Sequence, residues 1–116
     1  MAKSRSESIP LTMDKLKNIL TPLFEKQGVQ KAVVFGSFAR KTESRKSDLD
    51  LMIIVETSQR FFDRYESFNE IFELVRGPAI DMLIYTPEEF SQISHRPFIQ
   101  SILKEGSIIY EHRKEH

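Results

Sequence analysis

The segment Leu49–Val55 constrains the fold most, because every residue in it except Asp50 is apolar. Successive side chains of a β-strand point to opposite faces of the sheet, so a strand without polar alternation must be covered on both faces. A chain of 116 residues fits one compact domain and is too short for two independent cores. We therefore predict a central strand at residues 49–55, covered on both sides.

Helices are marked by periodicity and by their end signals. Apolar residues recur at helical spacing over residues 11–26, and Gly28 follows as a stop signal. Pro22 has no N–H donor and predicts a kink or break within this helix. Thr86-Pro87-Glu88-Glu89 has the form of a capping box, which predicts a helix start, and a further helix is expected at residues 97–105.

An aromatic stripe predicts another helix, which ends at Gly77 and turns the stripe toward the core. The members of the stripe are Phe61, Tyr65, Phe68, Phe72 and Val75. Phe62 lies off this stripe and is a candidate for a partner surface.

The remaining elements complete a mixed α and β pattern. Short strands are expected at residues 32–35, 79–85 and 107–110. The resulting order, α-β-α-β-α-β-α-α-β, predicts an α/β or α+β domain with a mixed sheet of three or four strands and helices packed against it. We expect this domain to span residues 11–111, with a flexible tail at residues 1–10 and a polar tail at residues 112–116.

Composition excludes several classes of protein. Lysine plus arginine and aspartate plus glutamate both number 17, and the zero net charge disfavours a nucleic-acid partner, which usually meets a basic excess. The absence of cysteine excludes disulfides and thiolate metal sites. No apolar run approaches the roughly 18 residues of a membrane span, and the polar start lacks the apolar stretch of a signal peptide. We therefore expect a cytoplasmic protein that is not attached to a membrane.

A glycine and a serine directly follow the predicted strand 32–35. Glycine lets the chain turn sharply and lets a ligand approach the backbone, so Gly36 suits a binding turn. If a helix begins at Ser37, its free N–H groups and positive dipole end form an anion site, and the hydroxyl adds a donor. The basic residues Arg40 and Lys41 follow, where they would either steer a triphosphate toward the turn or simply be solvated. This turn is therefore a candidate phosphate site.

Two aspartates open the central strand, eleven residues after Ser37. Asp48 and Asp50 are two positions apart, so their carboxylates project from one face and repel each other unless a cation lies between them. Oxygen ligands beside a phosphate site suit Mg²⁺, which takes its remaining ligands from water and substrate phosphates. Asp81 lies inside an apolar strand, where a charge is costly without a role, and is the candidate third carboxylate of a two-metal site.

Each of these features alone has a simpler explanation. Glycine-serine after a strand is usually a turn, and Asp-x-Asp is often a turn or a helix cap. Asp81 would equally suit an edge strand or the partner of a buried arginine. The combination is more informative, because four fixed residues at fixed spacing match by chance at roughly 10⁻⁵ per start position.

Gly36-Ser37-Phe38-Ala39-Arg40, with Ser47-Asp48-Leu49-Asp50-Leu51 downstream, resembles the signature of the polymerase-β-like nucleotidyltransferase superfamily. The short chain is similar to the minimal nucleotidyltransferases of bacteria and archaea. The resemblance implies a small mixed sheet flanked by helices, with Ser37 on the triphosphate. It also implies that Asp48 and Asp50 hold Mg²⁺ and that Asp81 is a third metal ligand or a base.

One residue departs from the family pattern, which commonly has glycine after the Ala-Arg pair where this chain has Lys41. If that position needs a positive φ, lysine costs around 1 kcal/mol and reshapes the turn. Lys41 would otherwise add a phosphate contact. The four chemical residues of the motif are unchanged in either case.

The resemblance implies an enzyme that binds ATP or another NTP with Mg²⁺, two ions in all, and transfers the nucleoside monophosphate to an acceptor hydroxyl. Larger relatives carry extra domains that position the acceptor, for which this chain has no residues. The acceptor is therefore expected on another protein. Minimal nucleotidyltransferases are typically paired with a HEPN-domain protein, and some are antitoxins that adenylylate a tyrosine of a HEPN toxin.

Two other functions stay open. The chain would instead be a binding module with a vestigial site that neutralises a HEPN-like partner by contact, or a transferase that acts on a small molecule or an RNA end. The three aspartates argue against the binding module, whereas Lys41 argues for it. The missing acceptor domain and the zero net charge argue against the other acceptors. A homo-oligomer or a hetero-oligomer is compatible with each function.

Overall fold

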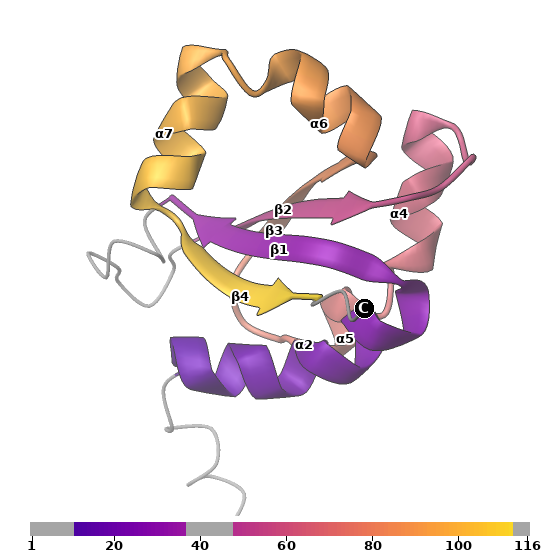
Figure 1. Cartoon of the computed structure of the whole chain (residues 1–116). Helices are drawn as coiled ribbons and strands as arrows, with labels where there is room; N and C mark the ends of the chain where they lie inside the picture. The colour runs from indigo at the N-terminus through magenta and orange to yellow at the C-terminus, as the bar shows by residue number, and fades with distance from the viewer. Residues whose placement is uncertain (1–10, 37–47, 113–116) are drawn as a thin grey trace, which may run out of the picture.

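A four-stranded mixed sheet with the strand order β3-β2-β1-β4 organises the chain (Figure 1). This computed structural model describes residues 11–36 and 48–112. The strands are β1 (Val29–Phe35), β2 (Leu49–Val55), β3 (Ile80–Tyr85) and β4 (Ser107–Glu111). β2 pairs parallel with β3, and β1 pairs antiparallel with both β2 and β4. The predicted α+β domain with a small mixed sheet is therefore confirmed.

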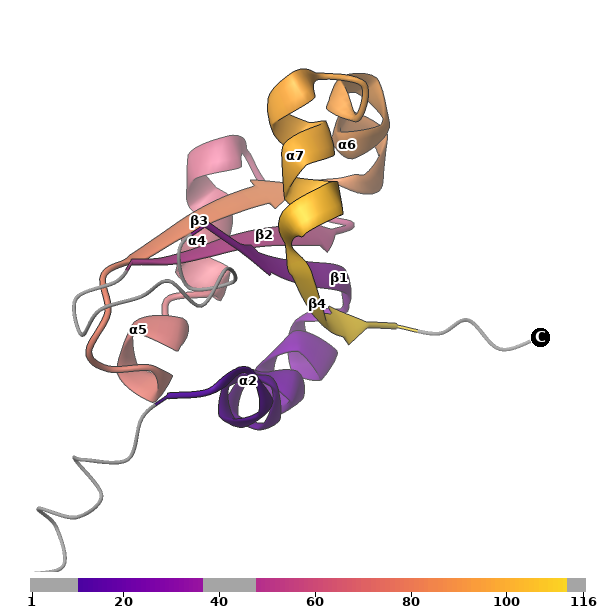
Figure 2. The ribbon, with the colours of Figure 1, turned by 90° about the vertical axis from the view of Figure 1, so that its left-hand side faces the viewer.

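Helices cover both faces of this sheet. They are α2 (Met13–Gln27), the short 3₁₀ turn η1 (Phe61–Asp63), α4 (Arg64–Ser67), α5 (Ile71–Leu74), α6 (Pro87–Ile93) and α7 (Pro97–Glu105). α2 and α5 lie on one side of the sheet, and α6 and α7 lie on the other (Figures 1 and 2). Within residues 11–36 and 48–112, each helix is too short or too polar to cross a membrane.

The core has one part on each face of the sheet. β2 contributes Leu51, Ile53 and Val55 to the face of α2, and Met52 and Ile54 to the face of α7. All five side chains are buried. β2 lies between β1 and β3, so the prediction of a central strand covered on both sides is confirmed.

The helix α2 continues through Pro22, which excludes the break that was one of the two predicted alternatives. Thr12 caps its first turn, where the hydroxyl oxygen accepts a hydrogen bond from the Lys15 N–H at 3.2 Å. Gly28 ends the helix in the left-handed conformation, with φ of 73°. An internal proline costs about 3 kcal/mol through the lost N–H and a steric clash. Leu20, Leu23 and Phe24 are buried on either side of it, and their packing offsets this cost.

The predicted helix over residues 61–75 is wrong as a single element. The structure has η1, α4 and α5 instead, with Phe68 outside helical geometry at φ −116° and ψ 15°. This interruption changes which side chains face the core, so Phe68, Ile71 and Val75 are buried. Phe61 and Phe72, which the stripe assigned to the core, are 38% and 47% exposed. Spacing alone therefore misassigned two of the five stripe residues.

The capping box at the start of α6 is confirmed and has an additional partner, the buried Arg64 of α4. The Thr86 hydroxyl accepts from the Glu89 N–H at 3.1 Å, and the Glu89 carboxylate accepts from the Thr86 N–H at 3.0 Å. Arg64 donates to both carboxylate oxygens of Glu89, at 2.7 and 2.9 Å. It also donates to the carbonyl oxygens of Ile84 and Gln59, at 3.0 and 3.1 Å. One guanidinium therefore joins α4, β3 and α6.

The ion pair with Arg64 predicts a specific loss of stability in acid. Hydrogen bonds from Arg64 and then from the Thr86 backbone lower the pKa of Glu89 from 4.5 to about 2. Because the folded pKa lies below the unfolded one, ionised Glu89 stabilises the fold above pH 4.5, and this contribution is lost as the pH falls toward about 2. Urea unfolding of Glu89→Gln should therefore depend less on pH in this window than unfolding of the wild type. Glu88→Gln, on the exposed neighbour, should follow the wild type, and equal pH profiles for all three proteins would contradict the prediction.

Candidate active site

Two of the predicted carboxylates lie side by side at one end of the sheet. Asp50 is the second residue of β2, Asp81 is the second residue of β3, and they are direct partners in the parallel register. Asp50 alternates with Met52 and Ile54, which face α7, so its side chain lies on that face of the sheet. Asp48 immediately precedes β2. The fold therefore brings together the three acidic residues that were predicted from the sequence.

The charges of these carboxylates act on one another. Burial raises the pKa of Asp50, and the negative charges of Asp81 and then Asp48 raise it further. In the described part of the chain, the salt bridges join Lys31 to Glu111 and Arg64 to Glu89, so none offsets these three charges. A cation at this edge would relieve the repulsion.

The arrangement suits a metal that arrives with its substrate. Among residues 11–36 and 48–112, no three aspartate, glutamate or histidine side chains form a group that would hold a metal ion by themselves. Mg²⁺ is commonly held by only one or two carboxylates together with water and substrate phosphates. Asp50, with Asp48 or Asp81 beside it, fits such an incomplete ligand set. Asp48 and Asp81 are exposed, which leaves room for those additional ligands.

Gly36 follows the last residue of β1 and lies directly beside the carboxylate of Asp50. Its φ of 81° lies in the left-handed region that favours glycine, and a Cβ added there would overlap the Asp50 Oδ2 atom. The sequence predicted a glycine that admits a ligand to the backbone, whereas the observed close neighbour is the carboxylate. Ser37, Arg40 and Lys41 of the predicted phosphate site lie outside the described residues. Their roles remain predictions.

Asp81 is not buried, contrary to the sequence-based expectation. A charge was considered costly within an apolar strand, but Asp81 is exposed because it lies near the start of β3, an edge strand of the sheet. Its position therefore has no desolvation cost that demands a role. Asp81 remains a candidate because it is paired with Asp50 in the sheet and raises the pKa of that carboxyl.

Phe98, in the first turn of α7, is an aromatic neighbour of this edge that was not predicted from the sequence. Its ring meets Phe35 edge-on, with centroids 6.1 Å apart and an interplanar angle of 83°. Phe35 is the direct partner of Asp50 in the antiparallel register of β1 and β2. A phenylalanine beside buried isoleucines in an amphipathic helix has the pattern of a core residue, so no local signal marked Phe98.

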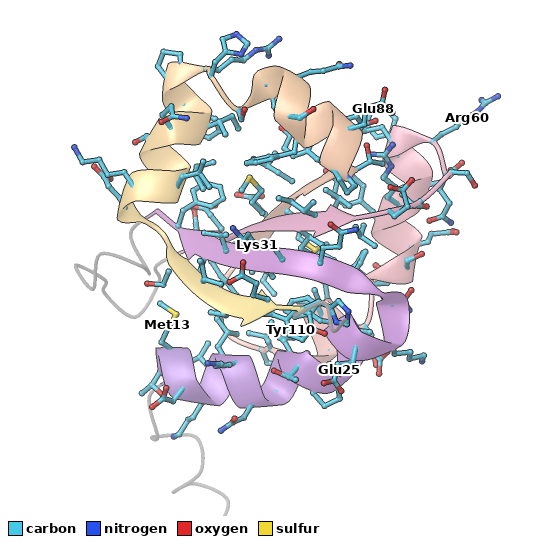
Figure 3. All side chains as sticks on the ribbon, in the orientation of Figure 1. Met13, Glu25, Lys31, Arg60, Glu88 and Tyr110 are labelled. Atoms are coloured by element: carbon cyan, nitrogen blue, oxygen red, sulfur yellow. The ribbon has the colours of Figure 1, made fainter. Side chains whose placement is uncertain are left out.

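Two hollows of the described surface lie away from the carboxylates. One of about 310 Å³ lies between α2 and β4, where Glu25 and Tyr110 line it (Figure 3). Burial and then the charge of Glu25 raise the pKa of Tyr110. The Tyr110 ring packs against Phe24, on the face of the sheet opposite Asp50, so this hollow is not part of the carboxylate site.

Comparison with known families decides the class of the protein. The family model described as "Polymerase beta, Nucleotidyltransferase" matches residues 15–115, nearly the whole chain. The chain belongs to this nucleotidyltransferase family. The carboxylate edge is accordingly the candidate active site of a nucleotidyltransferase.

Relatives of this nucleotidyltransferase carry consistent names. A protein of Methanocaldococcus jannaschii named "Putative protein adenylyltransferase" is 28% identical over 75 residues, which cover 65% of this chain and 80% of the relative. A crystal structure described as a "putative nucleotidyltransferase from Sulfolobus solfataricus" shares the fold with a TM-score of 0.57 and 20% identity, over 85% of this chain and 80% of that one.

A solved complex shares the fold as well. It is described as a tri-AMPylated Shewanella oneidensis HEPN toxin with its MNT antitoxin. The matching chain has a TM-score of 0.58 and 14% identity, over 87% of this nucleotidyltransferase and 74% of that chain. At this identity the match shows a common fold and nothing more.

The contact between Gly36 and Asp50 gives a prediction that separates site geometry from backbone strain. Gly36→Ala should displace the Asp50 carboxylate and lower nucleotidyl transfer on the order of 10-fold or more, because small shifts of reacting groups are costly. Gly28→Ala is the matched control, since Gly28 has a similar φ of 73° with open space at the Cβ position. Both variants should lose about 1 kcal/mol of stability from the left-handed conformation. Equal transfer rates for the two variants would show that the Gly36 contact has no role.

Proposed function

We propose that this nucleotidyltransferase transfers AMP from ATP to a tyrosine hydroxyl of a HEPN-domain partner and thereby acts as its antitoxin, with Mg²⁺ as the metal. The observation that carries the proposal is the pairing of Asp50 with Asp81 next to Gly36. Two findings about similar proteins support it. A relative is named a protein adenylyltransferase, and a chain of the same fold belongs to a complex with an AMPylated HEPN toxin.

In the proposed reaction the acceptor oxygen attacks the α-phosphorus of ATP. The bond from this phosphorus to the oxygen that bridges to the β-phosphate breaks, and pyrophosphate leaves with the bonding electrons. Mg²⁺, when bound, would neutralise charge on the phosphates. Asp48 and Asp50 would hold that metal. Asp81 is exposed at the edge, where its carboxylate is accessible to a partner's hydroxyl and takes the proton.

The open form of the edge favours a protein acceptor over a small molecule. A small-molecule site usually encloses most of its ligand in a cavity. Asp48 and Asp81 are exposed, as access by a protein surface requires.

The proposal is tested by incubation with labelled ATP, Mg²⁺ and a candidate HEPN-domain partner from the same organism. We expect the label on a tyrosine of the partner, located by mass spectrometry, and a loss of partner activity. The double variant Asp48→Asn/Asp50→Asn should transfer no label and leave the partner active. Labelling of serine or lysine residues alone would overturn the tyrosine assignment.

An exposed aromatic pair favours a second candidate, a binding module that neutralises its partner by contact. Phe62 is 81% exposed and meets the Phe61 ring edge-on, with centroids 5.4 Å apart. Exposed aromatic rings of this kind are common in protein interfaces. The same double variant distinguishes the candidates. Full neutralisation by Asp48→Asn/Asp50→Asn, with no label transfer by the wild type, would establish the binding module.

A further inference from the structure

Phe98 is more exposed than its packing requires. It lies in the first turn of α7 and is 59% exposed, whereas Ile99 and Ile102 of the same helix are each 2% exposed and form the contact with the sheet. The only ring that Phe98 meets among the described residues is Phe35, whose edge-on contact leaves most of the Phe98 side chain uncovered. The core therefore does not explain this aromatic residue.

Phe98 continues a row of side chains that crosses the candidate site. Asp81 pairs with Asp50 across β3 and β2, and Asp50 pairs with Phe35 across β2 and β1. Paired residues project from the same face of a sheet, with side chains about 5 Å apart. Phe98 meets Phe35 from α7, which covers this face. The row is acidic at one end and aromatic at the other.

A nucleoside triphosphate has two ends that match the two ends of this row. Its phosphates are anionic and bind through a metal to carboxylates, whereas its base is a flat ring that stacks on aromatic side chains. We propose that Phe98, supported by Phe35, is the stacking platform for the nucleobase of the substrate. This inference rests on the proposed function, because it places the phosphates at Asp50.

Binding of two probes by calorimetry tests the proposal. The probes are AMP-PNP and inorganic triphosphate, each with Mg²⁺, and the second lacks a base. Phe98→Ala should weaken AMP-PNP binding about 5- to 150-fold, as expected for loss of one base–aromatic stack, and leave triphosphate binding unchanged. Phe98→Trp should retain AMP-PNP binding, because the larger ring also stacks. Phe62→Ala, on an exposed phenylalanine of η1, is the matched control and should bind both probes as the wild type does.

Each alternative has its own result. If the wild type bound neither probe, the proposed function would fail and this inference with it. If the wild type bound AMP-PNP and Phe98→Ala bound it equally, the nucleobase platform alone would be overturned. A parallel loss of both probes in Phe98→Ala would instead indicate a structural role. Unchanged AMP-PNP binding with lost transfer to the partner would assign Phe98 to the protein interface.

Discussion

Asp50→Asn is expected to lower nucleotidyl transfer on the order of 100-fold or more and, at the same time, to stabilise the metal-free protein. The loss follows because Asp50 is the carboxylate at the centre of the proposed metal site, and metal contacts supply several kcal/mol of transition-state stabilisation. The gain in stability follows from the pKa of Asp50, which is raised by burial and by the charges of Asp81 and Asp48. A carboxyl with a folded pKa above its unfolded value destabilises the fold once the pH rises past both. Asparagine keeps the shape and removes the charge.

Transfer rates and thermal unfolding without metal measure the two effects of Asp50→Asn. Added Mg²⁺ should raise the unfolding temperature of the wild type more than that of the variant, because the variant has lost the charge that the ion offsets. Asp63→Asn, on an exposed aspartate of η1, controls for loss of a surface charge and should change neither quantity. A variant that loses transfer but is also less stable without metal would show that Asp50 has a structural role in the fold.

Arg64→Leu should lower the free energy of unfolding by about 2 kcal/mol, the magnitude expected when buried acceptors lose their donor, because the Glu89 side chain is 44% exposed and its carboxylate can return to water. Arg64 is 5% exposed and makes four hydrogen bonds, two to Glu89 and one each to the Ile84 and Gln59 carbonyl oxygens. Leucine leaves these acceptors without their donor. Urea unfolding at neutral pH measures the loss.

Two further variants control this result. Arg60→Leu removes an exposed arginine that points away from the protein, and it should change stability by less than about 0.5 kcal/mol (Figure 3). Arg64→Lys keeps the charge but cannot present a planar fork to Glu89, so it should recover only part of the loss. If Arg64→Leu and Arg60→Leu had the same free energy of unfolding, the contacts of Arg64 would contribute nothing to stability. Transfer per folded molecule should persist in all three, because Arg64 contacts the opposite end of β3 from Asp81.

The elements with local end signals were predicted most accurately. Residues 49–55 and 97–105 have the predicted bounds, because an apolar run defines the first and Pro97 and Gly106 delimit the second. The segment 61–75 has no such signals inside it, so spacing alone described it as one helix. The interruption at Phe68 and the continuity through Pro22 both depend on contacts with the sheet, which are not encoded in local spacing.

In the candidate site, too, the features with a local sequence signal were predictable and those that depend on distant contacts were not. Asp48 and Asp50 were recognisable because they open a strand together, but the partnership of Asp50 with Asp81 depends on the register of β2 and β3. A shift of one residue would turn Asp81 to the other face. The burial of Arg64 was also not predictable from the neighbouring sequence, since its partner Glu89 lies 25 residues away along the chain.

The central claim, nucleotidyl transfer, is tested most directly by which phosphate of ATP becomes attached to the partner. The wild type is incubated with the proposed HEPN-domain partner and with ATP labelled at either the α- or the γ-phosphate, in one sample with Mg²⁺ and in another with the metal removed by EDTA. We predict that the α-label becomes attached to the partner, that the γ-label appears in pyrophosphate, and that EDTA abolishes both. Attachment of the γ-label to the partner would contradict nucleotidyl transfer, as would neutralisation of the partner with neither label attached.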